Sequence, residues 1–113
     1  MKVRLVFVPP GGGEADYSLD FELPSLPQPG DYISIMRPDQ QGTEDFIVRR
    51  TGWTLDYPSN DVIAKQDTEG KVASIAVECE FALGYYSSEA HKKACGRYGR
   101  QSGQLKQFEA SAY

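Results

Sequence analysis

The sequence predicts a mostly β fold, a small antiparallel barrel of five or six strands with a short C-terminal helix. Several segments alternate apolar and polar residues with period 2, as strands with one buried face do. Residues 23–35 run from a proline-rich extended stretch through a Gly-Asp turn into such an alternating segment. The chain has 113 residues, the length of a single domain that buries its own core.

The first two strands are expected at residues 3–8 and 17–23, joined as a hairpin. The first is a short run of β-branched, leucine and phenylalanine residues that ends at a Pro-Pro-Gly-Gly-Gly loop. In the second, the apolar positions face the core, whereas Asp20 and Glu22 face water.

The third and fourth strands are expected at residues 32–36 and 45–55. The third follows the Gly-Asp turn and is polar on alternate positions. In the fourth, the inward positions shift in parity along the strand, and Gly52 is the expected place for the β-bulge that makes this shift. After the shift, Trp53 and Leu55 are expected to face the core.

The last clear strand is expected at residues 71–82, and residues 62–64 could form a short edge strand before it. Cys79 alternates in step with apolar neighbours and is expected in the core. Glu78 and Glu80 occupy the other face, which is expected to be solvated.

A short helix is expected over residues 87–96. It has serine at its cap, Glu89 in the first turn, lysines in the last turn and Gly96 at its end. The following residues are rich in Gly, Gln and Ser and are expected to be frayed, with Leu105 and Phe108 as their apolar anchors.

The charge is distributed unevenly around a formal net charge of −4. Residues 1–90, expected to form the barrel domain, carry a net charge of −8, and residues 91–113 carry +4. The second segment is expected to be a basic helix end and flexible tail rather than a domain. Such a tail can contact a polyanion or lie on its own acidic body.

Two sets of residues are candidate partner-binding surfaces. The first is an acidic strand face, which suits a basic partner or imitates nucleic-acid phosphate: Asp20, Glu22, Glu78 and Glu80. The second interleaves aromatic and basic residues in the C-terminal segment, a pattern that suits base stacking and phosphate neutralisation: Tyr85, Tyr86, Lys92, Lys93, Arg97, Tyr98 and Arg100.

No catalytic, cofactor-binding or metal-binding motif emerges. The three consecutive glycines at 11–13 lack the lysine and helix of a phosphate-binding loop. His91 and Cys95 are four residues apart and share a helix face. A structural zinc site needs four ligands, and a Cys-His nucleophile needs an oxyanion hole that nothing here supplies.

One segment carries a resemblance to small bacterial and phage-borne proteins. It reads Leu-Pro-x-x-Pro-x-x-Gly-Asp-x-Ile at residues 23–33 and continues into a strand with Phe46 to Val48 and Trp53. The resemblance implies an SH3-like or similar small barrel. It implies no activity, cofactor or site residue.

These observations favour a non-enzymatic protein-binding module. The alternatives are a nucleic-acid-associated factor that binds through the basic tail and a small acidic inhibitor of a nucleic-acid-binding machine, with an enzyme last. The N-terminal apolar run is stopped by two prolines and has no cleavage site, and no run is long enough to span a membrane. A cytoplasmic location is therefore expected; two reduced thiols are the ordinary state there, and a disulfide is possible but not implied.

Overall fold

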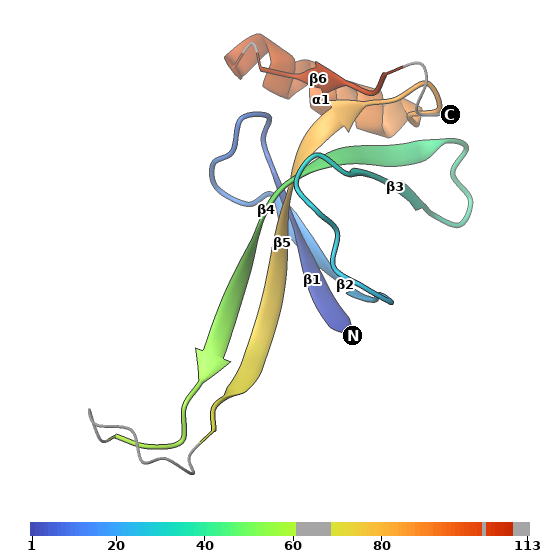
Figure 1. Cartoon of the computed structure of the whole chain (residues 1–113). Helices are drawn as coiled ribbons and strands as arrows, with labels where there is room; N and C mark the ends of the chain where they lie inside the picture. The colour runs from blue at the N-terminus through green and yellow to red at the C-terminus, as the bar shows by residue number, and fades with distance from the viewer. Residues whose placement is uncertain (61–68, 103, 110–113) are drawn as a thin grey trace.

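The computed structural model describes residues 1–60, 69–102 and 104–109 (Figure 1). The expected fold class is confirmed: the described residues are mostly β, with six strands in one curled mixed sheet that forms a half-barrel, and one helix. The elements in chain order are β1 (Lys2–Val8), β2 (Tyr17–Glu22), β3 (Tyr32–Met36), β4 (Thr43–Asp56), β5 (Lys71–Leu83), α1 (Glu89–Ser102) and β6 (Lys106–Gln107).

The strand order is β2-β1-β5-β4-β3, with β6 paired to the end of β5. The β1–β2 hairpin is antiparallel, as predicted. The expectation of antiparallel pairing throughout is wrong in two places, because β5 pairs in parallel with both β1 and β6. Parallel pairing needs a long crossover, and the β2–β4 excursion between β1 and β5 is long enough to provide it.

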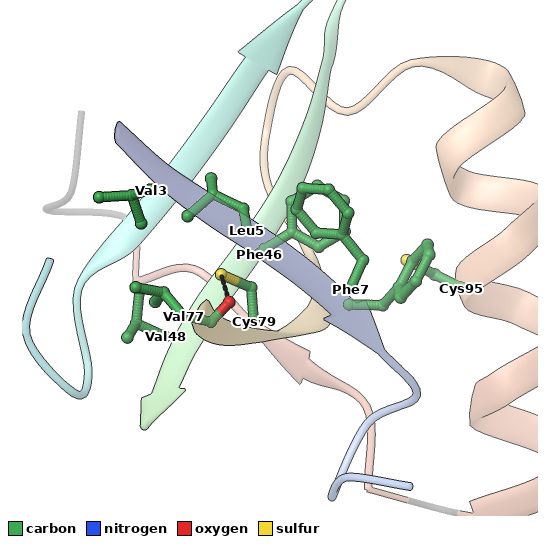
Figure 2. Packing of buried hydrophobic residues seen from close by; sticks show 9 residues of the cluster. Val3, Leu5, Phe7, Phe46, Val48, Val77, Cys79 and Cys95 are labelled. Carbon is green, nitrogen blue, oxygen red and sulfur yellow. Dashed lines mark hydrogen bonds between the residues drawn. The ribbon is translucent and has the colours of Figure 1, made fainter. Parts of the chain in front are cut away.

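The core lies on one face of the half-barrel, where alternate residues of β1, β4 and β5 meet (Figure 2). The rings of Phe7 and Phe46 have centroids 4.3 Å apart, and those of Phe46 and Phe81 lie 5.0 Å apart. Cys79 is fully buried, as predicted, and its Sγ donates to the carbonyl oxygen of Val77. Period-2 alternation in the sequence therefore identified this buried face correctly.

The β-bulge of β4 lies at Arg49, not at Gly52 as predicted. Val48 pairs with Cys79 and Arg50 pairs with Glu78, so Arg49 is the extra residue that shifts the inward parity. Gly52 pairs regularly with Ala76. A second irregularity between Thr54 and Leu55 leaves one extra residue on β5.

The helix starts close to the expected position but continues past its expected end at Gly96. Ser88 caps it, because its Oγ accepts a hydrogen bond from the backbone N–H of His91. The helix continues because Ala94, Cys95 and Tyr98 carry its apolar stripe onto the core.

The C-terminal segment is docked rather than frayed over residues 104–109. Lys106 pairs with Ala82 in the short parallel ladder between β6 and β5. Phe108 is 6% exposed, and its ring stacks on Tyr32 with centroids 4.2 Å apart. The predicted flexible tail is therefore wrong for these residues, whereas the predicted strand at residues 62–64 lies outside the described part of the chain.

Candidate functional site

The acidic residues of β2 are exposed, as predicted, but both are paired with cations. Arg4 Nε donates to Asp20 Oδ1 at 2.9 Å, and the N-terminal amine donates to Glu22 Oε1 at 2.8 Å. The hydrogen bond from Arg4 is the larger cause that holds the pKa of Asp20 below its usual value. This edge therefore presents ion pairs rather than bare carboxylates.

The glutamates of β5 belong to an acid–base cluster with three cations, which are Arg49, Arg50 and Lys106. The prediction of a solvated Glu80 is wrong, because its side chain is 1% exposed and Arg49 Nη1 donates to its Oε2 at 3.0 Å. Lys106 Nζ lies 3.2 Å from the other carboxylate oxygen of Glu80. The bulge at Arg49 allows two consecutive arginines to reach Glu78, through the Nε atoms of both.

The predicted acidic face is thus one sheet face, but a neutralised one. In register, Asp20 lies opposite Arg4, and Arg4 lies opposite Ala76, two residues before Glu78. Sequence alternation correctly assigned the four acids to one side, but the basic residues beside them come from distant strands and left no local signal.

The aromatic and basic residues of the C-terminal segment are divided by the fold. Tyr85 and Tyr86 are 65% and 63% exposed in the turn before α1. Tyr98 instead packs on Phe81 and donates a hydrogen bond to Asp16 Oδ2 at 2.8 Å.

The lysine and arginine residues of this segment do not form one patch in the described structure. Lys92 lies 3.3 Å from Glu89 in an exposed ion pair, and Lys93 and Arg97 are exposed on the helix. The side chain of Arg100 is outside the described part of the chain. The segment is therefore less suited to base stacking than the sequence pattern indicated.

A buried polar network around Asp45 was not predicted. Asp45 is fully buried, and its carboxyl group accepts hydrogen bonds from the hydroxyl groups of Ser34, Thr43 and Ser87. Its backbone N–H donates to His91 Nε2. The network joins β3, β4, the turn after β5 and α1, and it fixes the helix on the sheet.

The two cysteines are unsuited to nucleophilic chemistry. Burial, and to a lesser extent Asp45, raises the pKa of Cys95 to about 12, and burial with Glu78 raises that of Cys79 to about 12. Cys95 Sγ lies 3.4 Å from His91 Nε2, so the predicted shared helix face is confirmed. No group of three or more potential metal ligands forms among residues 1–60, 69–102 and 104–109.

An open cavity of about 420 Å³ lies beside His91, between the start of β2, the β3–β4 loop and α1. Tyr17 donates a hydrogen bond to Glu44 at 2.7 Å, and Arg37 forms a second hydrogen bond to the same carboxylate. Burial raises the pKa of Tyr17 strongly. For Glu44, burial opposes ionisation, but the hydrogen bonds from Arg37 and Tyr17 outweigh the effect of burial and lower the pKa of Glu44. Tyr17 and Glu44 therefore each hold one protonation state near neutral pH.

Several exposed apolar side chains lie together on a projecting ribbon, the β4–β5 arm, defined as residues 50–56 and 71–76 (Figure 1). The prediction that Trp53 and Leu55 face the core is wrong: they are 51% and 68% exposed. They do continue the apolar face of the sheet, because Trp53 pairs with half-buried Ile75 and Leu55 with Val72, which is 51% exposed. In the described structure β1 pairs with β5 only at residues 76–80, and β3 pairs with β4 only at residues 43–47. The arm therefore extends beyond the half-barrel.

We name these four side chains, Trp53, Leu55, Val72 and Ile75, the apolar arm face.

No helix in the described residues is long and apolar enough to cross a membrane. A scan of protein-family models, a search of curated proteins and a search of solved structures each found no match to this chain, and hence no enzyme family or homologue.

Proposed function

We propose that this chain is a non-enzymatic protein-binding module and that the apolar arm face is its main contact surface. The single observation that carries the proposal is the exposure of Trp53, Leu55 and Val72 on a ribbon that projects from the body. A two-stranded ribbon has little stability of its own in water. A partner that covers the apolar arm face would stabilise the ribbon and bury this surface.

The composition of the arm indicates the chemistry of the partner. Residues 51–55 and 72–77 contain no charged side chain. Such a surface complements an apolar groove or sheet on another protein rather than a phosphate backbone. Tryptophan is enriched among the residues that dominate binding energy, and burial of a large apolar side chain contributes about 1.5–3 kcal/mol.

The proposal changes the contact surface expected from the sequence. The acidic face carries ion pairs, and Glu80 is buried, so it offers less to a basic partner. Tyr85 and Tyr86 remain part of the proposal as a second exposed aromatic surface. Nucleic-acid association through the C-terminal segment has less support, because Lys106 lies against Glu80 and Tyr98 against Asp16.

Two further observations support a non-enzymatic role in a reducing, cytoplasmic setting. Both cysteines are free and buried, as thiols in a reducing compartment commonly are. Their raised pKa values also disfavour the thiolate that covalent catalysis needs.

The proposal is tested by affinity capture from the source cell, identification of the captured protein and titration of the purified pair. The double variant Trp53→Ser and Leu55→Ser is expected to weaken binding by at least about tenfold. Met36→Ser is the matched control, because Met36 is an 82% exposed apolar residue of β3, outside the arm. Equal binding by the double variant, with its fold intact by circular dichroism, would remove the apolar arm face from the proposal.

A further inference from the structure

The outer edge of β4 is open along the arm. β3 pairs with β4 from Thr43 to Ile47, and the turn before β3 contacts the backbone of Val48. Beyond that point, β4 pairs only with β5 in the part of the chain that the structure describes. Among the described residues, nothing pairs with the backbone N–H and C=O groups along this edge of residues 50–56, and such an edge is a template for another strand.

Two of the usual protections of an edge strand, proline and charge, are absent from the centre of this one. Residues 51–55, Thr-Gly-Trp-Thr-Leu, contain no proline and no charged side chain. The nearest charges in the strand are Arg50 at one end and Asp56 at the other, and they have opposite sign. Arg50 donates to Glu78 through Nε and remains 75% exposed.

These charges are complementary to those of an identical strand in antiparallel orientation. If two copies pair about Trp53, Arg50 lies opposite the partner's Asp56 and Asp56 opposite the partner's Arg50. β4 has no extra residue between these positions, so both side chains lie on the face opposite to Trp53, where cross-strand pairs can form. The same symmetry places Trp53 directly opposite the partner's Trp53 on the apolar face.

We propose that two copies of this chain associate through the β4 edge at residues 50–56, antiparallel and two-fold symmetric about Trp53. The pairing joins two arms into one four-stranded sheet whose apolar arm faces lie on the same side. The inference rests on the proposed function in treating the arm as a binding element, but it uses the edge of the arm, whereas partner binding uses its face.

Other pairings of the arm fit the charges less well. Parallel pairing in register would place Arg50 beside the partner's Arg50, which is unfavourable. The open edge of β5, residues 71–75, has Lys71 at one end and no acid within the strand at the other, and Lys2, Arg4 and Asp20 lie beside it. The β4 edge is therefore the self-complementary edge.

Sedimentation equilibrium of the full chain measures the association directly. We expect reversible dimers that weaken by about tenfold in Asp56→Arg, because this change places arginine opposite arginine twice in each dimer. The double variant Arg50→Asp and Asp56→Arg restores opposite charges and is expected to return the affinity to within about threefold of the wild type. Glu22→Arg is the control, because Glu22 is exposed on β2 and outside the arm.

Disulfide trapping tests the register. Directly opposed residues have Cα atoms about 4.5–5.5 Å apart, which a disulfide can span, whereas residues two positions out of register lie more than 7 Å apart. Trp53→Cys is therefore expected to form a covalent dimer under mild oxidation. Thr54→Cys lies opposite the partner's Gly52 and is expected to remain uncrosslinked, while the native thiols are buried.

Dimers that respond to the charge exchange and crosslink at position 53 but not 54 would support the inference. A monomer at all concentrations up to about 1 mM, or dimers indifferent to Asp56→Arg, would overturn it. Crosslinking at position 54 would overturn the register. The proposed function fails separately, if the double serine variant binds the captured protein as well as the wild type does.

Discussion

The backbone N–H of Asp45 on β4 donates a hydrogen bond to Nε2 of His91 on α1, across 3.1 Å. The same ring nitrogen lies 2.8 Å from the carbonyl oxygen of Ala82 on β5. A ring nitrogen in one tautomer either accepts or donates, so the tautomer of His91 selects one of these two contacts. The imidazole therefore links the helix to β4 in one tautomer and to β5 in the other.

Removal of the Asp45 carboxyl group is expected to destabilise the fold strongly. In Asp45→Ala, the hydroxyl groups of Ser34, Thr43 and Ser87 lose their shared acceptor. We expect a loss of at least about 3 kcal/mol in the free energy of unfolding, measured with urea. Asp45→Asn keeps one acceptor oxygen and is expected to lose less. A loss for Asp45→Ala no larger than that for the exposed control Glu22→Ala would show that the network contributes little.

Gly42 is expected to be a position that only glycine tolerates. Its φ is +91°, and a Cβ atom there would lie 2.5 Å from the carbonyl oxygen of Tyr86. Gly30 has the same φ, but a Cβ atom there would meet nothing within 4 Å. Gly30→Ala therefore measures the backbone strain alone, about 1 kcal/mol or more, and Gly42→Ala should cost about 1–3 kcal/mol beyond it. Equal losses in thermal unfolding would mean that the close approach to Tyr86 relaxes freely.

The buried thiols are expected to make the fold sensitive to alkaline pH. Each has its pKa raised from 9.0 to about 12 in the folded state. Their stabilising contribution is full below pH 9, and it is lost as the pH rises toward 12 because only the unfolded chain releases these protons there. Cys95→Ala is expected to reduce the slope of unfolding free energy against pH in this window by about 1.4 kcal/mol per pH unit.

The native thiols provide an independent check on this prediction. At pH 8 a thiol reagent is expected to modify Cys79 and Cys95 slowly in the folded chain and rapidly in urea. Fast modification without denaturant, or a pH slope unchanged by Cys95→Ala, would contradict the prediction.

Phe108 is expected to hold the C-terminal segment on the sheet. Its ring stacks on Tyr32, and its backbone N–H donates to the carbonyl oxygen of Leu83. In Phe108→Ala, hydrogen exchange at Lys106 and Gln107 is expected to accelerate, while exchange in β1 remains slow. Tyr32→Phe keeps the stacked ring and removes only the hydroxyl that accepts a hydrogen bond from the backbone N–H of Glu109, so it serves as the control. Unchanged exchange in Phe108→Ala would show that the backbone pairing with β5 and the Lys106–Glu80 ion pair hold the segment without the ring.

Local sequence pattern alone predicted strands β1 to β5, the start of the helix and the buried face of the sheet, but not β6. Alternation with period 2 is a local property, and one apolar residue in two is sufficient to identify Leu19, Val77 and Cys79 as inward positions. The Gly-Asp turn likewise marked the start of β3 correctly, because turn residues act through their own backbone preferences.

What lies against each face and each edge of the sheet depends on contacts between segments that are far apart in the chain. Trp53 has the pattern of a core residue and is exposed, because β4 continues past the part of the sheet in which β1 and β3 pair with β5 and β4. Glu80 has the pattern of a surface residue and is buried, because Arg49 and Lys106 reach it from β4 and β6. Burial and charge pairing depend on segments that are distant in the chain, and no local pattern records which of them meet.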